Sequence, residues 1–261
     1  MSYPLGTVAS VSTEKSSSPA AECQGIPYRK PEFNQPILTR RYQLSYLDEY
    51  GQIETATRLA PAIPDYEEAF SAFARGTVIA TSDGPVAVED LVPGMQALTA
   101  EDRSEKITWI GSMTLFPPRA MRGMHGGTLT RITADAFGIG RPMPDLVLGP
   151  GGRLLLRSRF GDRAGSVYAS ANNFVDGVSI IEVTPTAAVP VYHLMLERHG
   201  SLRAAGLEIE SYHPGVSRED RGPRAAQSFL SLFPHLRSFS GFGPLAHPHM
   251  TSSEVEAALA G

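Results

Sequence analysis

Short alternations of apolar and polar residues, rather than long helical periods, run along most of the chain. Residues 78–88 alternate in this way on both sides of Ser82-Asp83-Gly84, a typical hairpin turn. Further short runs of β-forming residues, bounded by Gly, Pro or polar residues, lie at 107–110, 129–132, 146–148, 154–156, 178–183 and 191–196. Each run predicts a short strand, and many short strands indicate an all-β domain.

A second hairpin is predicted upstream of these runs. Residues 37–47 supply strand-like apolar and aromatic side chains, 48–52 offer a turn, and 53–59 can pair back. Pro61 and Pro64 then interrupt regular structure. Residues 1–35 begin with a stretch rich in Ser, Thr, Ala and Gly, so we predict a disordered lead-in.

Few helices are expected, and they are short. Residues 65–74 predict one, with Asp65 as its N-cap. Residues 227–233 predict another, stopped by Pro234. Thr251-Ser-Ser-Glu254 has the spacing of a capping box and opens a third helix over 255–260.

Composition excludes several classes of function. The formal net charge of −4 and a pI of about 6.0 argue against a nucleic-acid binder, which would carry a basic surface. The single cysteine, Cys23, excludes an internal disulfide framework, and we interpret it as an exposed thiol without a role. No run approaches the ~18 apolar residues of a membrane helix, so no membrane partner is expected. The N-terminus lacks a secretory signal pattern, which makes the cytoplasm the default location, although leaderless secretion would leave no such mark.

Residues that bind metals or cofactors are sparse. His247 and His249 flank a proline and have no nearby acidic pair, so with His235 they make a poor zinc site. The loop at 121–127, which contains His125, is a weak copper candidate. Neither a phosphate-binding Gly-Lys-Ser/Thr loop nor a Gly-x-Ser-x-Gly elbow occurs. We therefore expect no cofactor and no metal.

Two blocks of the sequence together resemble a known family. Residues 72–77 read Ala-Phe-Ala-Arg-Gly-Thr, and residues 88–95 read Val-Glu-Asp-Leu-Val-Pro-Gly-Met. They resemble the opening of a Hint (hedgehog/intein) self-processing domain, whose frame is Cys-Phe-x-x-Gly-Thr followed by Val-Glu-Asp-Leu-x-Pro-Gly-Asp. The resemblance implies a compact all-β fold with pseudo-two-fold symmetry and a few short helices at the C-terminus. It also places Ala72 at the position of the family's nucleophilic cysteine.

A third block carries the position of the family's polarising histidine. Pro150-Gly-Gly152-Arg153, followed by leucines, resembles Ser/Thr-Pro-x-His-Arg-x-Leu, and Gly152 stands at the histidine position. The alternative is that these residues form a simple loop and align by chance. If the resemblance holds, both the nucleophile and the group that polarises the scissile peptide are missing.

The closing blocks resemble the last strands of Hint domains. Residues 191–199 contain His193, where an acidic residue often sits, and His199, which is in phase with it on an ideal strand. Both are candidates for a residual role, together with Thr77, although a strand histidine is more often a hydrogen-bonded or surface residue. Glu210-Ser211 replaces the terminal His-Asn pair of inteins, so C-terminal cleavage is not expected.

These observations give one organisation and two functions. We expect a lead-in at 1–35, a strand-containing segment at 36–71, a Hint-like domain at 72–212, and a packed extension at 213–261 that resembles bacterial Hint-domain proteins. Ala72 cannot attack the Ser71–Ala72 bond, so the resemblance implies a non-enzymatic interaction or structural module. Its partner would be another protein or its own N-terminal segment. The alternatives are self-cleavage by Ser71 or Thr77, or an unrelated β-rich binding protein.

Overall fold

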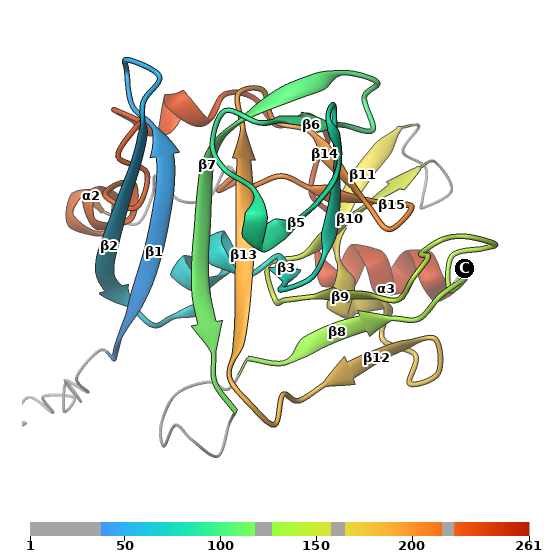
Figure 1. The fold of residues 1–261 in the computed structure, drawn as a ribbon. Helices are drawn as coiled ribbons and strands as arrows, with labels where there is room; N and C mark the ends of the chain where they lie inside the picture. Colours follow the sequence, from blue (N-terminus) through green and yellow to red (C-terminus); the bar gives the residue numbers. More distant parts are fainter. Residues whose placement is uncertain (1–37, 118–126, 158–164, 216–221, 261) are drawn as a thin grey trace, which may run out of the picture. The chain divides into compact units, whose positions relative to one another are not determined.

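The computed structural model describes residues 38–117, 127–157, 165–215 and 222–260 (Figure 1). The lead-in predicted at 1–35, Cys23 and His125 lie outside these ranges. No helix within them is long and apolar enough to cross a membrane.

Fifteen strands of the described residues form an antiparallel sheet, which confirms the all-β prediction. The path runs β11-β10-β15-β14-β4-β6-β7-β13-β3-β9-β8-β12, with β1 added to β7, β2 to β1 and β5 to β4. The pseudo-two-fold symmetry stays a prediction. The strands are β1 (Thr39–Leu47), β2 (Ile53–Pro61), β3 (Phe73–Ala74), β4 (Val78–Thr81), β5 (Gly84–Ala87), β6 (Gln96–Leu98), β7 (Ser104–Leu115), β8 (Leu129–Ile132), β9 (Leu146–Leu148), β10 (Arg153–Arg157), β11 (Ser166–Ser170), β12 (Ile180–Val183), β13 (Val189–Leu196), β14 (Ser201–Ala204) and β15 (Leu207–Glu210).

Both predicted hairpins are present. β1 and β2 pair from Leu47 opposite Ile53, and the Asp48 carboxylate accepts hydrogen bonds from two backbone N–H groups of the turn. Gly51 has a φ of +76°, a conformation that favours glycine. β1 also pairs with β7, with Ser45 opposite Ile110, so the upstream hairpin shares a sheet with the later strands.

The helices depart from the sequence prediction at the N-terminal end. The helix expected over 65–74 is only α1 (Pro64–Glu67) with a 3-10 turn at Glu68–Phe70, and Ile63 rather than Asp65 is the N-cap. The helix ends early because the residues that follow form β3, which pairs with β9 on one side and β13 on the other. The second helix, α2 (Pro223–Leu230), begins and ends a few residues earlier than expected.

The third helix, α3 (Ser252–Ala260), has the predicted capping box. The Thr251 backbone N–H donates to the Glu254 carboxylate at 2.8 Å, and the Glu254 N–H donates to Thr251 Oγ1 at 3.3 Å. The sequence signal for this helix was local, and it is confirmed.

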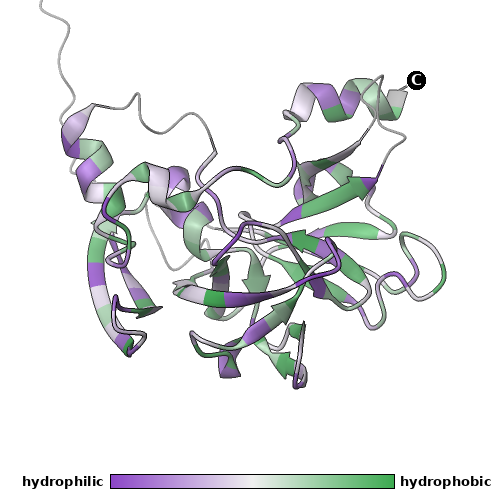
Figure 2. Cartoon of the chain, turned by 90° about the horizontal axis from the view of Figure 1, so that it is seen from above, coloured by the Kyte–Doolittle hydropathy of each residue, from purple (hydrophilic) through white to green (hydrophobic). Residues whose placement is uncertain are grey.

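The two largest hydrophobic clusters of the described residues pack against the sheet. One includes Phe73, Ile107 and Leu148, and the other is aromatic and includes Phe70 and Trp109. Figure 2 shows the hydrophobic colour concentrated in the strands. The Trp109 indole donates to the Leu232 carbonyl at 2.9 Å, so residues beyond 222 share a core with β7.

Candidate functional site

Ala72 and Gly152, the positions that the sequence resemblance aligns with the family's nucleophile and polarising histidine, lie next to each other. Ala72 precedes β3 and Gly152 precedes β10, yet a Cβ placed on Gly152 would lie 3.1 Å from the Ala72 carbonyl oxygen. The same oxygen accepts a hydrogen bond from the Gly149 N–H at 2.9 Å. The fold therefore brings together two positions that the sequence blocks singled out separately.

Backbone from residues 68–72 occupies the space in front of this glycine-rich turn. A Cβ on Gly149 would lie 2.2 Å from the Ser71 carbonyl oxygen, and one on Gly151 would lie 2.3 Å from that of Glu68. The Gly151 N–H donates to the Ser71 oxygen at 3.0 Å. Because main chain cannot give way as a flexible side chain can, positions 149 and 151 accept only glycine in this arrangement.

The Ser71–Ala72 bond is enclosed by protein. Both residues are 0% exposed, and the Ala72 N–H donates to the Tyr192 carbonyl at 2.9 Å. One residue upstream, the Phe70 ring packs at 4.4 Å from the Tyr42 ring and 5.3 Å from that of Trp109. The chain on both sides of the bond is therefore part of the folded core.

Of the three residual candidates, His193 reaches backbone 68–72 directly, and Thr77 lies a few residues further along the chain. The buried Thr77 hydroxyl donates to the Ala74 carbonyl at 2.8 Å. His193, on β13, is 1% exposed, and its Nδ1 lies 2.9 Å from the Glu68 carbonyl oxygen, to which it donates. Burial lowers the pKa of His193 to about 4, so the ring is neutral at pH 7. Among the described residues, neither His193 Nε2 nor Ser71 Oγ has a hydrogen-bond partner.

The third candidate, His199, belongs to a different network. It lies past the end of β13, which corrects the expectation that it continues the strand. Its Nδ1 accepts from the Ala246 N–H at 3.0 Å, so Nε2 carries the proton and donates to the Ser211 carbonyl at 3.0 Å. Nε2 also lies 3.2 Å from a Glu210 carboxylate oxygen.

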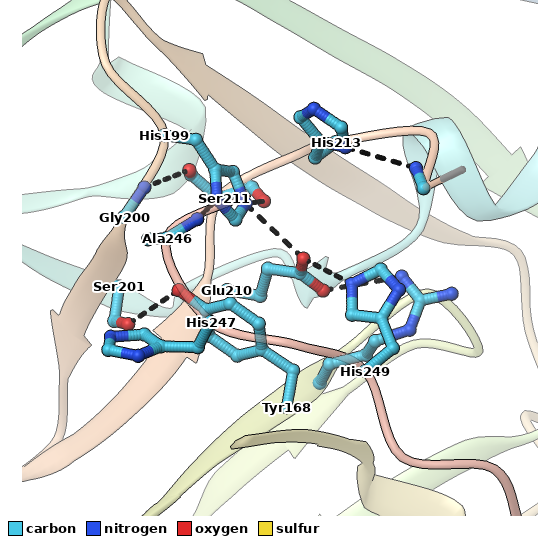
Figure 3. A network of polar contacts seen from close by, with 12 residues as sticks. Tyr168, His199, Gly200, Ser201, Glu210, Ser211, His213, Ala246, His247 and His249 are labelled. Carbon is cyan, nitrogen blue, oxygen red and sulfur yellow. Dashed lines mark hydrogen bonds and ion pairs between the residues drawn. The ribbon is translucent and has the colours of Figure 1, made fainter. Parts of the chain in front are cut away.

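Glu210 is the centre of this network (Figure 3). The residue is 1% exposed, and its Oε1 accepts from His249 Nε2 at 2.6 Å. Arg153 Nη1 lies 3.4 Å from Oε2. Burial alone would raise the pKa of Glu210, but the hydrogen bonds from both histidines and the charge of Arg153 hold it well below its usual range. A carboxylate satisfied in this way anchors structure rather than transfers protons.

A second carboxylate continues the network toward β11. Glu101 accepts from the Ser201 N–H at 3.0 Å and lies 3.2 Å from His247 Nε2. The Tyr168 hydroxyl is hydrogen-bonded to Ser201 Oγ at 2.8 Å, and its ring contacts the rings of three histidines, His199, His247 and His249. Burial raises the pKa of the Tyr168 hydroxyl.

Residues 246–250, here named the C-terminal strap, lie along β11. The Tyr168 N–H donates to the Pro248 carbonyl at 2.9 Å, and the Met250 N–H donates to the Tyr168 carbonyl at 2.8 Å. His249 extends from this strap to Glu210 (Figure 3), and His247 extends from it to Glu101.

Sequence reasoning missed this network. It found no acidic pair near His247 and His249, and the structure corrects that interpretation by bringing Glu101 and Glu210 to them from distant strand ends. No local signal could have found these partners, because each lies more than a hairpin away in sequence. Within the described residues, no group of three or more His, Cys, Asp or Glu side chains could hold a metal ion.

Known proteins resemble this chain in structure and in sequence to different degrees. A solution structure of a bacterial intein-like domain from Clostridium thermocellum matches with 12% identity and a TM-score of 0.39, over 54% of this chain and 98% of that one. A crystal structure of the MchDnaB-1 intein matches with 15% identity and a TM-score of 0.35, over 54% and 100%. No curated protein gives a significant match. The family model for the Hint domain matches residues 71–216, more than half of the 261 residues, and the chain therefore belongs to the Hint domain family.

Proposed function

We propose that this Hint-domain protein keeps the family scaffold without self-cleavage and acts as a protein-interaction or structural module. The observation that carries the proposal is the packing of backbone 68–72 against Gly149, Gly151 and Gly152, with Ala72 at the nucleophile position. Self-cleavage needs a nucleophile beside a peptide carbonyl, a group that handles the proton, and room for the reacting atoms. The methyl group of Ala72 cannot act as a nucleophile. Gly152 has no side chain that could handle a proton.

The buried bond also disfavours hydrolysis. Water must reach an ester intermediate to release the upstream fragment, and the residues on both sides of the Ser71–Ala72 bond are 0% exposed. Phe70, in the segment upstream of this bond, packs into the aromatic cluster. In this proposal the chain's own upstream segment therefore occupies the former cleft. That segment is the internal partner of the module.

Self-cleavage with another nucleophile is the second candidate, and one observation favours it. Ser71 Oγ and His193 Nε2 are both buried without hydrogen-bond partners among the described residues, and His193 is neutral, as a general base must be. Attack of Ser71 Oγ on the Phe70 carbonyl carbon would break the amide, form an ester and pass a proton to the released amine. Thr77 is a weaker nucleophile candidate, because its hydroxyl already donates to Ala74.

Intact mass separates these functions. We expect a single species of 28.1 kDa after long incubation with a thiol or with hydroxylamine, which would trap any ester. A fragment that begins at Ala72 would overturn the proposal. A fragment that begins at Ser71 and disappears in Ser71→Ala would establish the second candidate, and one that begins at Thr77 and disappears in Thr77→Val would establish Thr77. Each variant is checked for native circular dichroism before its mass is interpreted.

A further inference from the structure

β2 is a long strand with one open edge. Among the described residues it pairs with β1 alone, and it forms the outer edge of the sheet beside β1 (Figure 1). It has no proline before Pro61 and no glycine, and Leu59 is 71% exposed. The other strands of the described residues that pair on one side only, β5, β11 and β12, have four or five residues each. Soluble proteins seldom leave a regular strand of nine residues unpaired, because its free N–H and C=O groups are a template for another strand.

The sequence of β2 is complementary to itself. Residues 53–59 read Ile-Glu-Thr-Ala-Thr-Arg-Leu, with Ala56 at the centre. If two copies pair antiparallel about a two-fold axis at Ala56, Glu54 of each copy lies opposite Arg58 of the other. Ile53 then lies opposite Leu59, and the two threonines lie opposite each other. Within the described residues, neither Glu54 nor Arg58 forms an ion pair.

Neighbouring symmetric registers lack this match. Pairing centred on Glu54 or on Arg58 places like charges directly opposite each other, which is unfavourable. Pairing centred on either threonine sets both charges against uncharged residues. The register centred on Ala56 therefore satisfies both charges, and it keeps corresponding faces of the two sheets on one side.

We propose that β2 pairs with β2 of a second copy of this chain and forms a symmetric dimer. This inference goes beyond the proposed function and does not depend on whether the chain cleaves itself. A strand edge buries less surface than the ~800 Å² per partner of a standard interface, so we expect weak, concentration-dependent association.

Sedimentation velocity of the full chain over a wide concentration range tests the charge pattern. We expect Glu54→Arg and Arg58→Glu each to weaken dimerisation at least tenfold, and the double exchange to restore it. Glu182→Arg, an equal charge reversal on the exposed face of β12, is the matched control and should leave association unchanged. A monomer at every concentration, or a dimer that ignores these exchanges, would overturn the proposal.

Oxidative cross-linking tests the axis itself. In a Cys23→Ser background, Ala56→Cys places two thiols directly opposite each other, where antiparallel Cα atoms lie ~4.5–5.5 Å apart, within disulfide range. Leu59→Cys faces Ile53 instead and should not cross-link. Leu59 is exposed whereas Ala56 is half-buried, so random collision would favour the opposite result. Cross-linking of Leu59→Cys that equals or exceeds that of Ala56→Cys would contradict a two-fold axis at Ala56. So would an Ala56→Cys variant that stays monomeric and does not cross-link.

Discussion

Truncation of Phe70 to alanine tests whether the segment before the Ser71–Ala72 bond is part of the folded core. Phe70 is 0% exposed, and its ring contacts those of Tyr42 and Trp109. Removing a fully buried phenylalanine costs about 3–5 kcal/mol, of which ~0.5–1.5 kcal/mol belongs to each aromatic pair. A typical domain is stable by only ~5–15 kcal/mol, so the variant should lose about a fifth or more of its stability.

Urea unfolding gives the measurement, because Trp109 is the only tryptophan and is fully buried beside Phe70. Circular dichroism serves as a second probe, since the substitution changes the environment of the indole. Tyr50→Ala is the control, an aromatic truncation at a side chain that is 79% exposed, and it should change stability by less than about 0.5 kcal/mol. If Phe70→Ala costs less than about 1 kcal/mol with an unchanged m-value, the upstream segment is not core and the reasoning fails.

Three further predictions concern the site. Gly151→Ala should destabilise by more than about 2 kcal/mol in urea, because its Cβ would lie 2.3 Å from a carbonyl oxygen, and a variant as stable as the wild type would contradict this packing. The pKa of His193 is about 4 in the folded chain against 6.5 for an unperturbed histidine, so the unfolded chain takes up the proton first. His193 therefore costs no stability above pH 6.5 and up to about 3 kcal/mol as the pH falls to 4. His193→Asn keeps a hydrogen-bond donor near the position of Nδ1 but cannot titrate in this range. The free energy of unfolding should therefore depend less on pH between 6.5 and 4 than in the wild type, and an unchanged pH dependence would refute this assignment. His249→Ala removes a donor from buried Glu210 and should cost about 2–3 kcal/mol, with faster amide exchange at Met250; unchanged exchange there would show that His249 does not hold the strap.

The parts of the fold that sequence predicted are those fixed by local chemistry. The turn at 82–84, the turn at 48–52 and the capping box at Thr251 depend on residues within a few positions, and all three are present. The helix expected over 65–74 failed because Phe73 pairs with both Leu148 and Tyr192, contacts that outweigh the helix propensity of the preceding residues. The strand β11 was missed because its five residues carry little hydrophobic signal of their own.

The candidate site divides in the same way. Motif spacing marked Ala72 and Gly152, but it could not show that the glycine-rich turn meets backbone 68–72, since close approach depends on the whole chain path. The sequence likewise shows no acidic pair near His247 and His249. Their carboxylates come from separate strand ends that only the folded sheet brings to the strap.

The two segments that flank the Hint domain are both built into it, and this bears on what cleavage could achieve. Upstream, backbone 68–72 is hydrogen-bonded to the glycine-rich turn and to Tyr192. Downstream, the strap is held by Glu101, Glu210 and the backbone of Tyr168. Release of a flanking segment after its bond is broken requires weak contacts between that segment and the domain. Here a broken bond at residue 72 would leave the two pieces held by buried aromatic and polar contacts, so cleavage there would yield a nicked complex rather than a released fragment. Ala72→Cys with Gly152→His should therefore run as one species on native gel filtration, whatever denaturing electrophoresis shows, and separation of two folded pieces would contradict the structural role of both flanks.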